Sequence, residues 1–200
     1  MEKILQQGAE AIIYLKDSKV IKDRIKKSYR IPELDDKIRK QRTKSETNLL
    51  EKASKIIDSP KPNIIFEKNK IQMPFINGEK LSECLDDFPL KKQREICRKI
   101  GENTATLHAA DIIHGDLTTS NMILKEGKIF FVDFGLGFIS KKIEDKAVDI
   151  HLLKEALEAK HFKNWEVLLR EFLKGYEKYF EHKKVLEQLK KVEMRGRYRH

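Results

Sequence analysis

Three polar side chains in two short segments have the types and the order that phosphoryl transfer requires. Asp116 and Asn121 belong to the segment HGDLTTSN, and Asp133 opens the tripeptide DFG twelve residues after it. One Asp can orient an attacking hydroxyl, while an Asn and a second Asp can hold magnesium on the phosphates of a nucleotide. The pattern H-x-D-x-x-x-x-N followed by D-F-G therefore predicts Asp116 as the catalytic residue and Asn121 and Asp133 as metal ligands.

The chain between these two segments has the pattern of a small hairpin. Met122–Leu124 and Ile129–Val132 are short apolar runs, and the turn signal Glu126–Lys128 separates them. Such a hairpin places both segments at the same end, so that the three polar groups meet. Polar groups between apolar strands need partners, and a bound magnesium nucleotide would provide them.

A lysine and a glutamate further upstream could complete the site. Lys22 lies in a strand, where it could reach the phosphates as a point charge. Glu46 lies in a long amphipathic helix predicted from Asp35 or Asp36 to about Ile57, and it could pair with Lys22 and hold it on the phosphates. The alternatives are a solvated strand lysine and a surface glutamate.

The chain begins with three short predicted strands, Ile4–Gln7, Ala11–Lys16 and Lys19–Arg24. The turn around Gly8 is where a loop covering the phosphates would lie, and Gly8 is a candidate nucleotide contact. The turn has one glycine and does not match G-x-G-x-x-G, so an ordinary hairpin turn is the alternative.

A connector follows a second predicted hairpin over Ile64–Glu67 and Lys70–Met73. Extended backbone in this connector could hydrogen-bond an adenine edge through main-chain groups, and the alternative is a plain linker. The candidate nucleotide contacts here are Met73, Pro74, Phe75 and Ile76.

The second half of the chain is mostly helical in pattern. The predicted helices span Leu90–Ala110, Ala147–Ala159, Asn164–Phe180 and His182–Val192. His108 on the first of them is interpreted as a packed core histidine rather than a ligand.

The composition indicates one basic domain that could divide into two lobes. The 200 residues include 42 Lys and Arg against 32 Asp and Glu, which gives a net charge of +10. Residues 16–44 alone contain 12 Lys and Arg against 5 Asp and Glu, a net charge of +7. This charge favours polyanionic partners such as RNA, although a solvated basic face is the alternative. The chain has two cysteines, no signal peptide pattern and no apolar run of membrane-spanning length. These features favour a cytoplasmic protein that does not associate with a membrane.

The last residues combine arginines with an aromatic ring and are expected to form a mobile tail over 194–200. Arginine interleaved with an aromatic residue suits phosphate contacts and base stacking, while a solvated terminus is the alternative. The candidate RNA contacts are Arg195, Arg197, Tyr198 and Arg199.

The order of these motifs resembles the protein-kinase-like fold over nearly the whole chain. The resemblance implies a minimal α+β, two-lobed fold, with an N-lobe over 1–76 and a C-lobe over 77–193. The opening QGAEA, the loop HGDLTTSNMI and the terminal RGRYR further resemble the small atypical kinase of the KEOPS (EKC) complex, which includes the bud-site-selection and PRPK proteins.

Membership of that family implies a role in forming threonylcarbamoyladenosine at position 37 of tRNAs that read ANN codons. It implies ATP and Mg²⁺ as cofactors. The implied partners are tRNA, two small KEOPS subunits and the subunit that transfers the carbamoyl group. In some archaea the kinase is fused to the C-terminus of the transfer subunit, so a fused segment before Met1 is left open.

The same resemblance assigns roles by motif. It makes Asp116 the catalytic Asp, Asn121 and Asp133 the metal ligands, Lys22 the phosphate lysine with Glu46 as its partner, and Asp149 the group that holds the catalytic loop backbone. The chain also departs from ordinary protein kinases. Gly115 replaces the Arg that binds a phosphorylated activation loop, Thr118 stands where a Lys is usual, and no A-P-E follows DFG. Restricted phosphorylation of proteins, with ATP hydrolysis in the assembled complex, is therefore expected.

Two other functions remain as alternatives. A small-molecule kinase of the aminoglycoside or choline type shares H-G-D, but the chain lacks an obvious additional helical subdomain for such a substrate. A non-catalytic pseudo-kinase scaffold would bind nucleotide as a structural ligand, although all the catalytic side chains are present.

Overall fold

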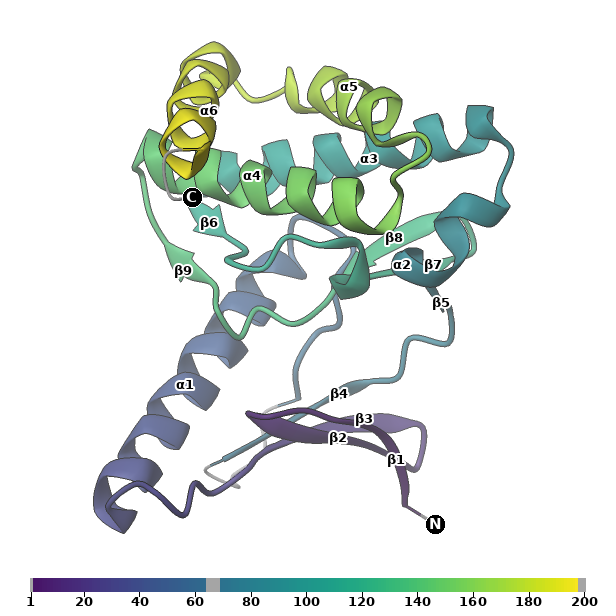
Figure 1. Cartoon of the computed structure of the whole chain (residues 1–200). Coiled ribbons are helices and arrows are strands. Elements are labelled where there is room, and N and C mark those ends of the chain that lie inside the picture. The colour runs from purple at the N-terminus through teal and green to yellow at the C-terminus, as the bar shows by residue number, and fades with distance from the viewer. Residues whose placement is uncertain (1, 64–68, 198–200) are drawn as a thin grey trace.

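A four-stranded antiparallel sheet and one long helix form the N-lobe (Figure 1). The structure is a computed structural model and describes residues 2–63 and 69–197. The sheet order is β1-β2-β3-β4, which confirms the three strands predicted before Arg24; the predicted strand Ile64–Glu67 lies outside the described residues. The strands are β1 Lys3–Gln7, β2 Ala11–Lys16, β3 Lys19–Arg24 and β4 Lys70–Pro74.

Helix α1 spans Pro32–Ala53, so it begins and ends earlier than predicted. Pro32 occupies the first turn of the helix, where its missing N–H costs nothing and its fixed φ is already helical. The helix ends at Ala53, and the Ile57 N–H still bonds to the Ala53 carbonyl in the turns that follow. The interior face of α1 buries Glu46, Leu49 and Leu50, which places the predicted glutamate toward the sheet.

The remaining chain forms the mostly helical C-lobe, which contains two small antiparallel sheets of order β5-β7-β8 and β6-β9. The strands are β5 Glu79–Lys80, β6 Ile112–Ile113, β7 Met122–Lys125, β8 Lys128–Phe131 and β9 Phe138–Ile139. The helices are α2 Leu81–Cys84, η1 Leu85–Asp87, α3 Leu90–Ala109, η2 Thr119–Asn121, α4 Ile143–Lys160, α5 Trp165–Tyr176 and α6 His182–Arg197.

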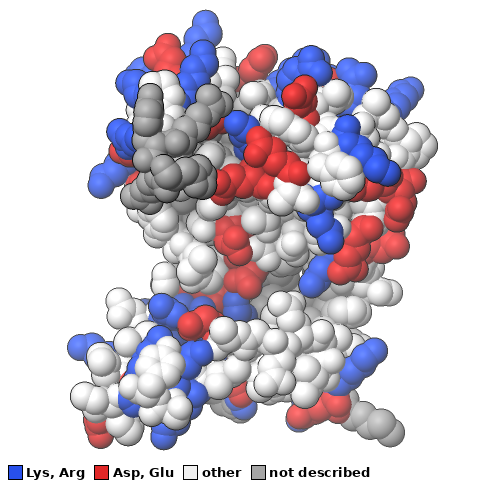
Figure 2. Space-filling view, in the orientation of Figure 1, with Lys and Arg blue, Asp and Glu red and all other residues white. Residues whose placement is uncertain are grey.

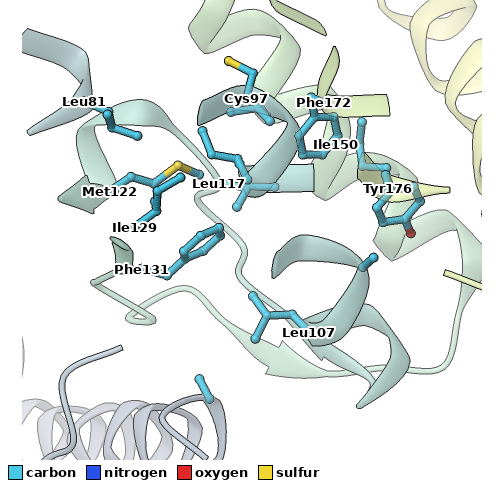
Figure 3. Packing of buried hydrophobic residues seen from close by; sticks show 14 of the residues in the cluster. Leu81, Cys97, Leu107, Leu117, Met122, Ile129, Phe131, Ile150, Phe172 and Tyr176 are labelled. Carbon is cyan, nitrogen blue, oxygen red and sulfur yellow. The ribbon is translucent and has the colours of Figure 1, made fainter. Parts of the chain in front are cut away.

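The hydrophobic core includes residues from the catalytic segment and from the hairpin that follows it (Figure 3). Leu117, between Asp116 and Asn121, is fully buried with Met122 and Phe131 of the β7–β8 hairpin. Figure 3 shows these side chains between the hairpin and the residues of α3 and α5. Burial of each such side chain contributes about 1.5–3 kcal/mol relative to leaving it exposed, so the hairpin and the loops at its end are held to one place.

Three helix boundaries in the C-lobe differ from the prediction. Helix α4 begins at Ile143, so Asp149 lies in its second turn rather than its first. Helix α5 ends at Tyr176, and Phe180 beyond it is exposed. Helix α6 continues to Arg197, so residues 194–197 are helical and not a mobile tail, because the Lys, Glu and Leu residues that precede Gly196 favour helix. Among the described residues, no helix has the length and apolar character to span a bilayer.

Candidate active site

A cleft of about 300 Å³ lies between the two lobes. In Figure 2 the molecule narrows between its upper and lower parts, and charged side chains gather at this waist. Neither Gly8 nor Asp116 belongs to the described lining, although Asp116 contacts Asn121, which does. The predicted residues that do line the cleft are Lys22, Glu46, Met73, Pro74, Phe75, Ile76, Asn121 and Asp133.

Lys22 forms two ion pairs, one within the N-lobe and one that reaches the C-lobe. Its Nζ donates to Glu46 Oε1 at 2.8 Å and to Asp133 Oδ1 at 2.7 Å. Lys22 comes from β3 and Glu46 from the buried face of α1, while Asp133 follows β8 in the C-lobe. The contact predicted between Lys22 and Glu46 is therefore present, and it lies at the bottom of the cleft.

The charges of this group reinforce one another. Burial alone would lower the pKa of Lys22, but the carboxylates of Glu46 and Asp133 outweigh it and raise the pKa. Burial alone would raise the pKa of Asp133, but Lys22 and the N–H of Gly135 lower it. Lys22 is thus held as a cation and Asp133 as a carboxylate, which are the forms that contact phosphate and metal.

The backbone at Asp133 has an uncommon conformation, with φ at +61°. Left-handed backbone at a residue with a side chain costs about 1–2 kcal/mol and persists where surrounding contacts fix it. Asp133 Oδ1 accepts from the Gly135 N–H at 3.1 Å, and Phe134 between them is fully buried. The buried Phe134 fixes the turn, and the turn directs the Asp133 carboxylate into the cleft.

Asn121 and Asp116 are in direct contact. The side-chain amide of Asn121 donates to the carbonyl of Asp116 at 2.9 Å and to its Oδ2 at 2.8 Å. The Val132 N–H donates to the backbone carbonyl of Asn121 at 2.9 Å, which ties the loop to the strand that leads into Asp133. The amide nitrogen of Asn121 is used by these bonds, and its amide oxygen is the atom suited to a metal.

A buried aspartate on α4 holds the backbone of the loop that carries Asp116. Asp149 Oδ2 accepts from the His114 N–H at 2.8 Å, and Oδ1 accepts from the Gly115 N–H at 2.9 Å. Oδ2 also lies 3.2 Å from Nε2 of His108, whose Nδ1 is 2.7 Å from the Tyr176 hydroxyl. His108 is fully buried, as predicted for a packed histidine. Burial alone would raise the pKa of Asp149, but these bonds and His108 lower it.

The ring of His114 links the same loop to β8. Nε2 lies 3.1 Å from the Val132 carbonyl, and Nδ1 accepts from the Asp116 N–H at 3.3 Å. This pattern requires a neutral ring with its proton on Nε2. Burial lowers the pKa of His114, in agreement with a neutral ring. The first residue of the motif is therefore a support for Asp116.

One member of the charged group, Arg24, was not predicted from the sequence. Arg24 Nη2 pairs with Glu46 Oε2 at 2.5 Å, so Glu46 accepts from two cations on β3. Side chains at positions i and i+2 of a strand point to the same face, and the spacing from Lys22 to Arg24 could have revealed this. A second missed contact, between Thr119 of the loop and His161, has no sequence signal because forty-two residues separate the partners.

The predicted RNA contacts are only partly described. Arg195 forms an ion pair with Glu144 on α4 and its side chain remains 66% exposed. Tyr198, Arg199 and the side chain of Arg197 lie outside the described residues.

The donor set of the cleft suits magnesium better than a transition metal. Asn121 and Asp133 offer oxygen ligands, and Mg²⁺ is commonly held by one or two carboxylates together with substrate phosphates. Among the described residues, no group of three His, Cys, Asp or Glu side chains has the arrangement of a self-sufficient metal site.

The RIO domain family model matches residues 12–147, from β2 to the first turns of α4. The whole chain also superposes on the Rio2 kinase of Chaetomium thermophilum, solved as an ADP/Mg²⁺-phosphoaspartate complex, with a TM-score of 0.65 at 13% identity, covering 97% of this chain and 70% of that one. Fold and site thus define an atypical kinase of the RIO class, and the predicted α+β kinase-like fold is confirmed.

Similarity over the full length narrows the class. The chain is 43% identical to the KEOPS complex subunit Bud32 of Pyrococcus abyssi, over 98% of this chain and 96% of that protein. It is 39% identical to a probable serine/threonine-protein kinase BUD32 homolog of Archaeoglobus fulgidus, over 96% of this chain and 94% of that protein. The chain belongs to the Bud32 family of KEOPS subunits.

Some relatives are longer. The chain is 42% identical to a probable bifunctional tRNA threonylcarbamoyladenosine biosynthesis protein of Methanobrevibacter smithii, over all of this chain but 37% of that protein. The chain therefore spans little more than a third of such relatives.

Proposed function

We propose that this chain is an ATP-dependent atypical kinase and ATPase that acts within a KEOPS complex and supports threonylcarbamoyladenosine formation at position 37 of tRNA, in the cytoplasm. The observation that carries the proposal is the convergence of Lys22, Glu46, Asp133 and Asn121 in one cleft, with Asp116 bonded to Asn121. These five residues come from both lobes, and they form the set that phosphoryl transfer from MgATP requires.

Each residue has a distinct role in this proposal. Lys22 contacts the phosphates, and Glu46 keeps Lys22 in position. Asn121 and Asp133 hold Mg²⁺, which when bound neutralises the charge on the phosphates. Asp116 orients the attacking hydroxyl or water. It keeps its position because Asp149 holds the backbone just before it and the His114 ring accepts from its own N–H.

The connector Met73–Ile76 lines the cleft at the boundary between the lobes. This position supports the proposal that main-chain groups of the connector bond an adenine edge. Gly8 lies in the loop between β1 and β2, and its N–H bonds to the Ala11 carbonyl. Gly8 is proposed to cover the phosphates when the nucleotide is present.

Hydrolysis of ATP in the assembled complex is the proposed reaction, ahead of phosphorylation of protein substrates. Only the short strand β9 separates Gly135 from the start of α4 at Ile143, which leaves little backbone to align a peptide. Thr118 also provides no cation beside Asp116.

The proposed partners are tRNA, the small KEOPS subunits and the threonylcarbamoyl-transfer subunit. The names of the relatives support this, because one group is named for the KEOPS complex and the other for bifunctional proteins of threonylcarbamoyladenosine synthesis. Similarity over the full length to Bud32 proteins also weighs against a small-molecule kinase.

ATP turnover by Asp133→Ala and Asp116→Ala variants tests the function, alone and with the transfer subunit and tRNA. Loss of a metal ligand should lower turnover by roughly two or more powers of ten, the scale of electrostatic stabilisation in such sites. Glu158→Ala, which removes a partly exposed carboxylate of α4, is the control and should keep full turnover. Equal turnover by Asp133→Ala and the wild type would refute the assignment of Asp133. Intact tRNA modification with Asp116→Ala would favour a scaffold.

A further inference from the structure

Arg24 is a buried cation whose side chain has a single partner among the described residues. It lies on β3 two residues after Lys22. All three charged residues are buried: the exposed fraction is 5% for Arg24, 6% for Lys22 and 1% for Glu46. Arg24 Nη2 pairs with Glu46 Oε2, and Arg24 Nε has no hydrogen-bond partner among the described residues. The Arg24 charge is therefore directed at Glu46.

Glu46 has one oxygen for each cation. Oε1 accepts from Lys22 and Oε2 from Arg24, whereas Lys22 is shared with Asp133 in the other lobe. A buried carboxylate that loses its counter-charge is destabilised by several kcal/mol. If Lys22 were the only cation beside Glu46, Lys22 would have to neutralise that carboxylate as well as serve the cleft.

We propose that Arg24 is a positioning residue that neutralises Glu46 permanently, so that α1 stays docked and Lys22 is available to the nucleotide phosphates. This inference rests on the proposed function and identifies a residue on which it depends. Arginine suits the task because its guanidinium does not lose its proton in proteins. The arrangement also gives a physical reason why the chain needs no phosphorylated loop to bring Glu46 to Lys22.

A double-mutant cycle on MgATP turnover tests the proposal. Arg24→Met should lower kcat/KM on the order of 10- to 100-fold, the scale expected when a group that positions the site is displaced. In a Glu46→Gln background, Arg24→Met should cause less than about a threefold further loss, because the carboxylate through which Arg24 acts is gone. Arg24→Lys should restore part of the activity, since it returns the charge without the fixed planar geometry of the guanidinium.

The control is Arg42→Met, the same substitution at an arginine on the helix that carries Glu46. Arg42 forms an exposed ion pair with Glu10. Arg42→Met should change kcat/KM less than twofold. Losses from Arg24→Met and Glu46→Gln that multiply independently would overturn the proposal, as would an Arg24→Met variant with wild-type kcat/KM. If Arg24→Met does not fold, the same cycle with Arg24→Lys decides between coupled and independent losses. The proposed function is decided separately, by turnover of the wild type against Asp133→Ala, so failure of that function and failure of the role of Arg24 are distinguishable.

Discussion

The Asp149→Asn variant should loosen the loop that carries Asp116 although Asp149 is not part of the cleft lining. Asp149 is 1% exposed and accepts two backbone N–H groups, from His114 and Gly115, one on each carboxylate oxygen. Asparagine has nearly the same shape but offers one oxygen and one NH₂ group. Whichever way the amide turns, a donor faces a donor at one of these two N–H groups.

The cost can be worked out from these contacts. One buried N–H loses its acceptor, which costs about 1–3 kcal/mol, and the bond that remains is no longer charge-assisted, which costs about 1 kcal/mol more. The free energy of unfolding should therefore fall by about 2–4 kcal/mol. For a chain of this size each kcal/mol shifts Tm by about 2–4 °C, so Tm should fall by roughly 4–16 °C.

Thermal and denaturant unfolding measure this change, and ATP turnover of the still-folded variant measures its effect on Asp116. The control is Glu158→Gln, the same acid-to-amide change at a partly exposed pair with Lys154 on the same helix. Its free energy of unfolding should change by no more than about 0.5 kcal/mol. An Asp149→Asn variant with the Tm of the control would show that the carboxylate does not hold the loop.

Three further predictions concern neighbouring features. Gly115→Ala should abolish turnover or destabilise the fold strongly, since φ is +77° and the added Cβ would lie 2.2 Å from the Leu136 carbonyl oxygen. Gly127→Ala, with φ of +75° and no atom within 4 Å, should lower the free energy of unfolding by only about 1–2 kcal/mol. Equal losses of the two variants in urea unfolding would contradict this. The pKa of His114 is lowered in the folded state, so its contribution to stability is present above its ordinary value of 6.5 and is lost as pH falls toward the folded pKa. The free energy of unfolding should therefore decrease below pH 6.5 by up to about 1.4 kcal/mol per pH unit, and His114→Asn should remove that part of the slope in denaturant titrations. Deleting residues 195–200 should weaken tRNA binding and make it less dependent on salt, with unchanged binding ruling out an RNA contact.

The sequence was sufficient for features that depend on local pattern. The strands before Arg24 follow from alternating apolar residues between turn signals, and the meeting of Asp116, Asn121 and Asp133 follows from the hairpin between their segments. The pairing of Lys22 with Glu46 was predictable for another reason. Their order in the chain matches a known arrangement, and the structure brings their charged atoms to 2.8 Å.

Contacts that depend on packing between distant segments were not predictable in this way. His161 reaches Thr119 and Asp86 because three separate elements meet around it, and a lone histidine gives no signal of that. The end of α6 was also wrong in the prediction. A run of charged residues with arginines is typical both of a solvated tail and of an exposed helix. In the structure α6 includes Arg195, which also pairs with Glu144 on α4.

The supports around the cleft indicate how a short chain can keep a catalytic geometry without a long regulatory segment. Lys22 is fixed from the N-lobe by Glu46, and Glu46 is fixed in turn by Arg24. In the C-lobe, Asp149 fixes the loop before Asp116, and the Val132 N–H fixes the loop at Asn121. These supports come from elements of the lobe in which each residue lies, so each half of the site is positioned by its own lobe. Control of such a site is then expected at the binding of partners, because the described chain has few residues between Gly135 and α4 that could act as a switch.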